Sequence, residues 1–165
     1  MGCAGSSNEI ENSPFRNYNH NIKLVLYYHN YFRDKHNAEK LIFSSELSQK
    51  AQSKLIQLEK DIFNYNSQDD DNEIGENLFI TKEKDVDIIE KACQTWYNEK
   101  NNYNFNLNKY QNGTGHFTQM IWKKTKEIGS GYLEAKNGNI YFLVLYSPIG
   151  NELFKFIENI EEEKK

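Results

Sequence analysis

The sequence predicts a domain that mixes α-helices with a few β-strands, and two observations support this fold class. Three segments in the first two thirds of the chain carry apolar residues at the three- and four-residue spacing of a helix. Two segments in the last third carry the apolar runs of strands, joined by a turn. Because both signals occur within 165 residues, we expect the elements to pack in layers around one core.

The composition narrows the class of protein. Hydrophobic residues make up 38% of the chain and aromatic residues 14%, which argues against disorder over most of its length. The net charge of -4 argues against nucleic acid as a partner. The longest apolar run, residues 140–146, is far shorter than the roughly 20 residues of a membrane span. The N-terminus lacks the hydrophobic region of a signal peptide, and two cysteines form no disulfide framework, so we expect an intracellular, reducing compartment.

The first six residues fit the pattern for N-myristoylation. Gly2 would become the terminal residue after removal of Met1, and Ser6 occupies the required position. Cys3, beside the acylated glycine, is a candidate palmitoylation site. Since one myristoyl chain binds membranes only marginally and no polybasic patch follows, Cys3 would have to supply the second signal. The alternative is that these small residues form a flexible terminus without modification.

The first helix is predicted over residues 19–36, where Ile22, Val25, Leu26 and Phe32 recur at helical spacing. His29, Arg33 and His36 are four and three residues apart and share one face. Histidines in such positions are more often hydrogen-bonded core or rim residues than metal ligands. We therefore expect a structural role for all three.

Two further helices follow. Ser44 or Ser45 can cap the second one, whose apolar stripe is Leu47, Ala51, Leu55, Leu58 and Ile62. Residues 64–72 are polar and turn-prone, and their three adjacent aspartates lack the spacing of a calcium loop, so a solvated loop is expected. Asp85 is the predicted cap of the third helix, with Val86, Ile89, Cys93 and Trp96 along one face. Cys93 is predicted to be a buried thiol.

The last third of the chain carries the strand signals. Two glycines at 113 and 115 predict a tight turn that leads into a strand, because apolar and other residues alternate from 117 to 122. His116 would lie at the mouth of this turn, as a hydrogen-bonded residue or as part of a site. Residues 128–134 and 140–146 predict a hairpin, and the continuous apolar run of the second strand indicates burial on both faces. The charged tail, residues 161–165, is expected to fray.

Several motifs together resemble the CAP superfamily, also called the SCP/TAPS domain, which includes cysteine-rich secretory proteins, venom antigens and pathogenesis-related proteins. Residues 115–122, Gly-His-Phe-Thr-Gln-Met-Ile-Trp, are similar to the first signature of this family, and residues 146–151 to the second. Gly-Glu-Asn-Leu at 75–78 and the pair Trp96 and Glu99 resemble two further family elements. Val144 stands where secreted members carry a cysteine, so the resemblance is closest to the intracellular Golgi-associated pathogenesis-related branch.

The resemblance implies an α+β fold, an α-β-α sandwich with a small, mainly antiparallel sheet between helical layers. We expect residues 1–18 to form a flexible acylated segment, residues 19–157 the CAP domain and residues 158–165 a charged tail.

The resemblance also implies a cleft lined by two histidines and two glutamates, of which Glu76, Glu99 and His116 match. Tyr65 stands where the second histidine is expected. A hydrolytic zinc site usually has about three protein ligands, and a tyrosine is a neutral phenol at neutral pH. Two carboxylates also favour a charged imidazolium, which binds no metal. We therefore predict no catalytic residue and no cofactor, with zinc binding by His116, Glu99 and Glu76 weak at best.

Two functions remain open from the sequence. The first is a non-enzymatic, membrane-tethered intracellular CAP domain that binds lipid or a protein partner at a membrane surface. The second is a metal-dependent hydrolase that uses the residual cleft. The first implies a peripheral protein of the Golgi, another endomembrane or the inner face of the plasma membrane, and not a secreted one. A homodimer is expected only by analogy with intracellular relatives.

Overall fold

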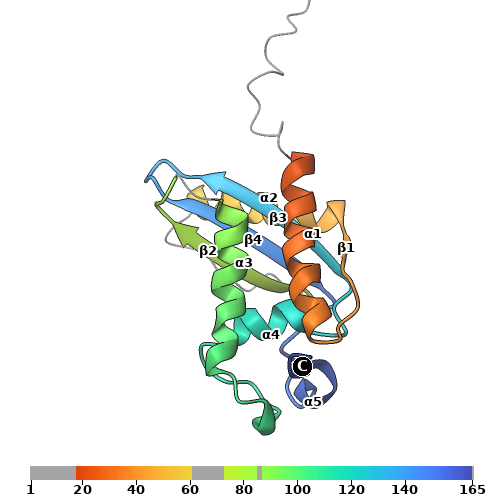
Figure 1. Ribbon diagram of the computed structural model, residues 1–165. Helices are drawn as coiled ribbons and strands as arrows, with labels where there is room; N and C mark the ends of the chain where they lie inside the picture. The colour runs from red at the N-terminus through yellow and green to blue at the C-terminus, as the bar shows by residue number, and fades with distance from the viewer. Residues whose placement is uncertain (1–17, 61–72, 85–86, 165) are drawn as a thin grey trace, which may run out of the picture.

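A computed structural model describes residues 18–60, 73–84 and 87–164 of the chain. Figure 1 shows how helices and strands alternate along the described chain. The elements are, in order, α1 (Tyr18–Lys35), β1 (Ile42–Phe43), α2 (Ser45–Lys60), β2 (Gly75–Thr81), α3 (Ile88–Asn98), the 3-10 turns η2 (Glu99–Asn102) and η3 (Phe105–Leu107), α4 (Gly115–Ile121), β3 (Glu127–Glu134), β4 (Ile140–Ser147) and α5 (Phe156–Asn159). Gly2, Cys3 and Tyr65 lie outside the described residues.

The four strands form one sheet in the order β1-β3-β4-β2. β4 pairs antiparallel with both neighbours, whereas the two-residue β1 pairs parallel with β3. β4 is buried along most of its length, as its apolar run predicted. The predicted hairpin is confirmed, since Ala135 N–H donates to the Asn139 carbonyl at 2.8 Å and Gly138 takes a positive φ of 81°.

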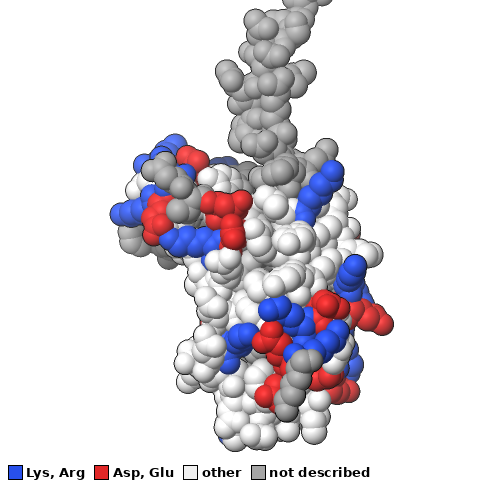
Figure 2. Space-filling view, viewed as in Figure 1, with Lys and Arg blue, Asp and Glu red and all other residues white. Residues whose placement is uncertain are grey.

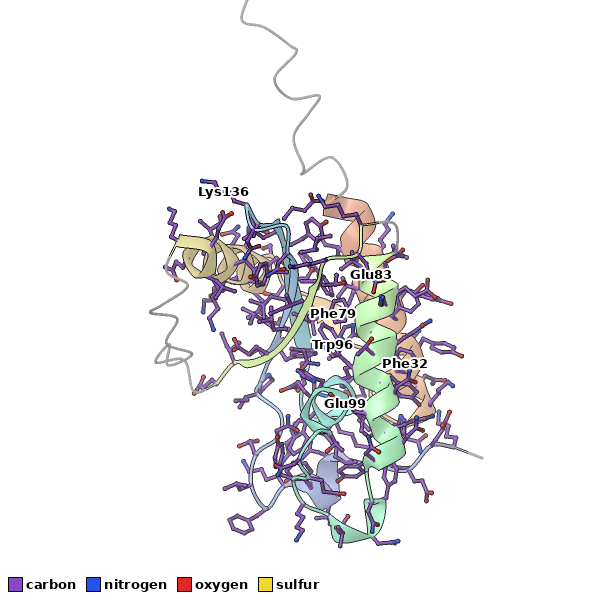
Figure 3. All side chains as sticks on the ribbon, turned by 90° about the vertical axis from the view of Figure 1, so that its left-hand side faces the viewer. Phe32, Phe79, Glu83, Trp96, Glu99 and Lys136 are labelled. Atoms are coloured by element: carbon purple, nitrogen blue, oxygen red, sulfur yellow. The ribbon has the colours of Figure 1, made fainter. Side chains whose placement is uncertain are left out.

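Helices cover both faces of this sheet. On one face, α2 packs Leu47, Ala51 and Leu55 against Leu143 and Leu145 of β4. The other face carries the larger core, to which α1, α3 and α4 contribute. Figures 1 and 3 show α2 on one side of the sheet and α1 with α3 on the other. The expected α-β-α sandwich with a mainly antiparallel sheet is thereby confirmed.

Residues 115–121 correct one prediction, because they form the helix α4 and not a strand entered from a turn. The two-residue alternation of residue types that suggested a strand does not correspond to a buried and an exposed face. Phe117, Met120 and Ile121 are all inaccessible to solvent. A strand alternates between a buried and an exposed face, whereas residues 117–121 are buried on every side.

Two smaller predictions are also wrong. The N-cap of α3 is Asp87, whose side chain accepts a bond from Glu90 N–H at 3.0 Å, and not Asp85. The tail does not fray over residues 161–164: Lys164 N–H donates to the Lys35 carbonyl at 2.8 Å, and Glu163 is paired with Lys35 at 3.1 Å. The Ser44 cap of α2 is confirmed by its bond from Leu47 N–H at 3.3 Å.

Within the described ranges, no helix has both the length and the apolar character that crossing a bilayer requires.

Candidate functional site

Glu99 and His116 meet where α3 ends and α4 begins. His116 Nδ1 donates to Glu99 Oε1 at 2.7 Å, and the imidazole lies nearly parallel to the Trp96 ring with centroids 6.0 Å apart. The side chain of His116 is 42% exposed and that of Glu99 is 20% exposed. Glu99 and Trp96 are labelled in Figure 3. Because the carboxylate accepts the hydrogen bond from Nδ1–H, it orients the ring and leaves Nε2 as the nitrogen that can meet a ligand.

Glu99 also caps the N-terminus of α4. Its Oε2 accepts bonds from the backbone N–H groups of His116 at 3.0 Å and Phe117 at 3.1 Å. The residue in the N-cap position, Thr114, makes no such bond, because its hydroxyl donates to the Gln111 carbonyl at 2.7 Å. A carboxylate at this end satisfies two unpaired donors and interacts favourably with the helix dipole.

Arg33 holds the opposite end of α4. Its guanidinium donates to the carbonyls of Met120 at 3.0 Å, Trp122 at 2.8 Å and Thr125 at 3.2 Å, and its Nε to that of Glu39 at 2.7 Å. The residue is completely buried, and this burial lowers the pKa of Arg33 to about 10. It therefore stays protonated at neutral pH and compensates four carbonyls. The predicted structural role of Arg33 is confirmed.

A buried hydrogen-bonded chain joins α1, β4, β2 and α4. His29 Nδ1 donates to the Val25 carbonyl at 2.8 Å, so its Nε2 accepts a hydrogen bond from the Tyr146 hydroxyl at 2.7 Å. Asn77 Nδ2 donates to Tyr146 Oη and to the His116 carbonyl, both at 3.1 Å. Burial lowers the pKa of His29 to about 4 and raises the pKa of Tyr146 well above its usual value. His29 is therefore a neutral core histidine, as predicted.

The sequence analysis did not single out Tyr146 and Asn77 as site residues. Asn77 belongs to the Gly-Glu-Asn-Leu motif and Tyr146 opens the second signature, so motif membership was the signal available. His36 is also buried, donating to the Glu161 carbonyl at 2.7 Å and lying 3.0 Å from the Tyr97 hydroxyl. The prediction that His36 is structural is confirmed as well.

Glu76 does not join Glu99 and His116. It precedes Asn77 on β2, and successive side chains of a strand point to opposite faces. Asn77 faces α4, whereas Glu76 forms an ion pair with Lys54 of α2 at 2.9 Å. Of the three described cleft residues, the structure thus brings two together. Over residues 18–60, 73–84 and 87–164, no group of three or more His, Cys, Asp or Glu side chains is placed to hold a metal.

Cys93 offers no nucleophile. It is wholly buried and not bonded to another cysteine, and its Sγ lies 3.8 Å from His29 Nδ1. Desolvation by burial raises the pKa of the thiol, so the reactive thiolate is disfavoured at neutral pH. The prediction of a buried thiol is confirmed.

Comparisons with known proteins agree with this geometry. The family model described as "CAP: Cysteine-rich secretory protein family" matches residues 26–147. The human Golgi-associated plant pathogenesis-related protein 1 is 33% identical over 144 residues, which cover 86% of this chain and 92% of that protein. Venom allergen 5 of the wasp Polistes dominula is 30% identical, covering 79% of this chain and 68% of the relative.

Solved structures give the same result. Venom allergen-like protein 4 of Schistosoma mansoni superposes with a TM-score of 0.65 at 26% identity, covering 87% of this chain and 94% of that one. NaASP2 has the same TM-score at 22% identity, covering 87% and 85%, a likeness that shows the fold alone. Because the family model matches residues 26–147, which include α4 and all four strands, and because the human relative is 33% identical over most of both chains, this chain belongs to the CAP family.

Proposed function

We propose that this chain is a non-enzymatic CAP domain, tethered to an intracellular membrane surface by acyl chains on Gly2 and Cys3, where it binds lipid or a protein partner. The observation that carries this proposal is the N-terminal acylation pattern in a chain that is 33% identical to a protein named for its association with the Golgi. Two acyl chains would provide stable anchoring that a single myristoyl chain does not.

The charge distribution supports attachment through acyl chains more than through a basic surface. Figure 2 shows lysines and arginines interleaved with acidic side chains in the clusters on the visible face. Lys124 and Lys126, two members of the one basic cluster in the sequence, are paired with Glu158 at 2.7 Å and with Glu39 at 2.5 Å. Neutralised lysines attract anionic headgroups weakly, so another anchor is needed.

The role of Glu99 supports a non-enzymatic function. Both of its oxygens accept hydrogen bonds, two from the backbone of α4 and one from His116. A carboxylate committed to holding a helix is poorly placed to move toward a metal or a substrate. Glu76 is likewise paired with Lys54 on the other side of the sheet.

The proposal is tested by expressing the untagged full-length chain in eukaryotic cells, followed by membrane fractionation and intact-mass measurement. We expect the mass of myristate and palmitate on the membrane-bound protein. Gly2→Ala should release nearly all of it to the cytosol, and Cys3→Ser should release much of it. Ala4→Ser is the matched control and should stay membrane-bound. Membrane association of both acylation variants, or a mass without acyl groups, would contradict the proposal.

The metal-dependent hydrolase stays a second candidate because of one observation. Glu99 orients an imidazole whose side chain is 42% exposed, an arrangement that also suits a general base or a metal ligand. The related NaASP2 crystal structure was solved with Zn2+, but that likeness extends to the fold alone. A hydrolase screen with and without zinc discriminates between the two functions. Metal-dependent activity that is lost in a folded His116→Ala variant would favour the hydrolase.

A further inference from the structure

The most exposed large apolar side chains of the described residues gather at one corner of the molecule. Leu153 is 71% exposed, Phe154 95% and Ile157 71%, whereas no other large apolar side chain in the described ranges exceeds 60%. Leu153 and Phe154 occupy the centre of a turn that Lys155 N–H closes on the Glu152 carbonyl at 3.2 Å, and Ile157 follows in α5. In Figure 1 this corner lies at the end of the molecule opposite the start of α1.

The backbone of this turn is unusual. Phe154 has a φ of 65°, a region that glycine and asparagine tolerate and bulky residues rarely adopt. The other non-glycine residues with positive φ in the described chain, Asn37, Asn108 and Asn151, are all asparagines. An aromatic residue at such a position carries a steric cost, and its side chain gains no burial in return. Backbone outliers of this kind cluster at functional sites.

The base of the corner is firmly packed. Phe156 is 1% exposed, and its ring lies edge-to-face against Trp122 with centroids 5.0 Å apart. Asn159 is completely buried: its Nδ2 donates to the Lys155 carbonyl at 2.8 Å, and its Oδ1 accepts from Lys124 N–H at 2.9 Å. The segment therefore turns Phe156 and Asn159 inward as an anchor, whereas Leu153, Phe154 and Ile157 point into solvent.

We propose that Leu153, Phe154 and Ile157 form a wedge that inserts into the interfacial region of a lipid bilayer. Side chains exposed to this degree protrude, and three of them are too few for a stable protein interface, which buries roughly 800 Å² on each partner. Insertion into a bilayer needs no matching pocket and depends on apolar area. It also complements an acyl chain that binds marginally alone.

The charges around the wedge make its binding independent of headgroup charge. Lys155 is paired with Glu152 at 2.6 Å, and Lys124 with Glu158 at 2.7 Å. These pairs leave little net field to attract anionic lipid. Partitioning should therefore be similar on neutral and anionic vesicles and insensitive to salt, which distinguishes the wedge from a basic surface.

The segment between the proposed acyl chains and the domain has a maximum reach greater than the length of α1. α1 is roughly 27 Å long at 1.5 Å per residue. Residues 4–17, which separate Cys3 from α1, can span at most roughly 50 Å. The wedge does not depend on acylation, so it can be tested on a protein that carries no acyl chain.

The experiment uses the unacylated full-length chain with Cys3→Ser, mixed with vesicles of phosphatidylcholine alone or with added phosphatidylserine. A reporter variant, Phe154→Cys carrying an environment-sensitive fluorophore, should show a blue shift on both kinds of vesicle. Buried Cys93 should stay unlabelled. Phe154→Gly should lower vesicle partitioning roughly tenfold, the factor that corresponds to about 1.4 kcal/mol. It should not lower stability, because glycine adopts positive φ without strain.

Ile80→Ser, which removes an apolar side chain that is 50% exposed on β2, is the matched control and should partition like the parent. The wedge is overturned by an unacylated chain that does not partition, by unchanged partitioning of Phe154→Gly, or by binding to phosphatidylserine vesicles alone. Dimerisation that Phe154→Gly abolishes would show that a second copy covers the corner instead. None of these outcomes depends on Gly2 or Cys3. A failure of the wedge is therefore distinguishable from a failure of the proposed acylation, which the fractionation experiment tests.

Discussion

The two ends of α4 perform the same task with opposite charges and very different burial. At the N-terminus, the carboxylate of Glu99 accepts from two backbone N–H groups, and at the C-terminus the guanidinium of Arg33 donates to Met120 and Trp122 carbonyls. Both charges match the helix dipole. Arg33 is completely buried, whereas the Glu99 side chain is 20% exposed and bonds to a still more exposed His116.

This difference in burial distinguishes a purely structural residue, Arg33, from a pair that can also contact a ligand, Glu99 with His116. A buried guanidinium surrounded by carbonyls can only hold the fold, because any movement would leave a charge and its partners unsatisfied. At the other end, Glu99 holds the helix, while the imidazole of His116, whose side chain is 42% exposed, can still meet solvent or a ligand. A helix of seven residues is too short to be stable alone, so both ends matter.

The largest effect is expected from Arg33→Met. It removes the donor to four backbone carbonyls, and each buried acceptor left without a partner costs about 1–3 kcal/mol, so a loss of roughly 3 kcal/mol or more is expected. Guanidinium unfolding followed by circular dichroism measures the loss. Arg33→Lys should recover little, because an ammonium group cannot reproduce the planar fork. A loss below about 1 kcal/mol in Arg33→Met would show that water replaces the guanidinium.

The free energy of unfolding should also depend on pH, because His29 is buried in the core. Because the His29 pKa of about 4 lies below its ordinary value of 6.5, the unfolded chain binds the proton more readily. The stability that neutral His29 contributes is fully present above pH 6.5 and is lost as pH falls from 6.5 towards 4, by about 3 kcal/mol in all. Unfolding free energies measured across this window test the sign.

His29→Gln should flatten that pH dependence without abolishing it, because burial also lowers the pKa of His36. An unchanged slope in His29→Gln would assign the acid sensitivity to other groups.

A smaller loss is expected from Glu99→Gln at the exposed end. The amide keeps one acceptor oxygen but loses the charge that strengthens the bonds to His116 and Phe117, which corresponds to about 1–2 kcal/mol. Chemical unfolding provides the measurement, with Glu134→Gln as an exposed control. Equal losses in the two variants would mean that Glu99 does not cap α4.

His116→Ala should have the smallest effect on stability, below about 1 kcal/mol, because the His116 side chain is 42% exposed. A loss as large as that of Arg33→Met would place His116 among the structural residues. A small loss would leave its imidazole available for binding.

Zinc titration measures whether His116 and Glu99, at the exposed end of α4, can bind a metal. We expect binding weaker than micromolar at neutral pH, because His116 and Glu99 meet without Glu76 and Tyr65 replaces a histidine. Tyr65→His should tighten zinc binding roughly tenfold or more if one ligand contributes about 1.4 kcal/mol. Calorimetry on both proteins gives the two constants. Submicromolar binding by the parent chain, abolished in His116→Ala, would contradict this expectation.

Local patterns in the sequence predicted much of the fold. α1, α2 and α3 carry their apolar residues at helical spacing, and the hairpin of β3 and β4 has a glycine at its turn, so each is specified by residues close together in the chain. The motif residues also identified the pair Glu99 and His116, although periodicity alone would not have joined them. The resemblance to the family supplied the layer order.

The tertiary structure decided what depends on distant partners. Residues 115–121 form a helix because Arg33, 87 residues before Met120, and Glu99 hold its ends. Glu76 lies apart from the site because the register of β2 turns it toward Lys54 of α2. The sequence by itself determined α1, α2, α3, the hairpin of β3 and β4 and the resemblance to the family, since hydrophobic period and turn residues act locally. Only tertiary packing decided how the ends of α4 are capped and which face Glu76 takes, because those energies come from contacts between remote segments.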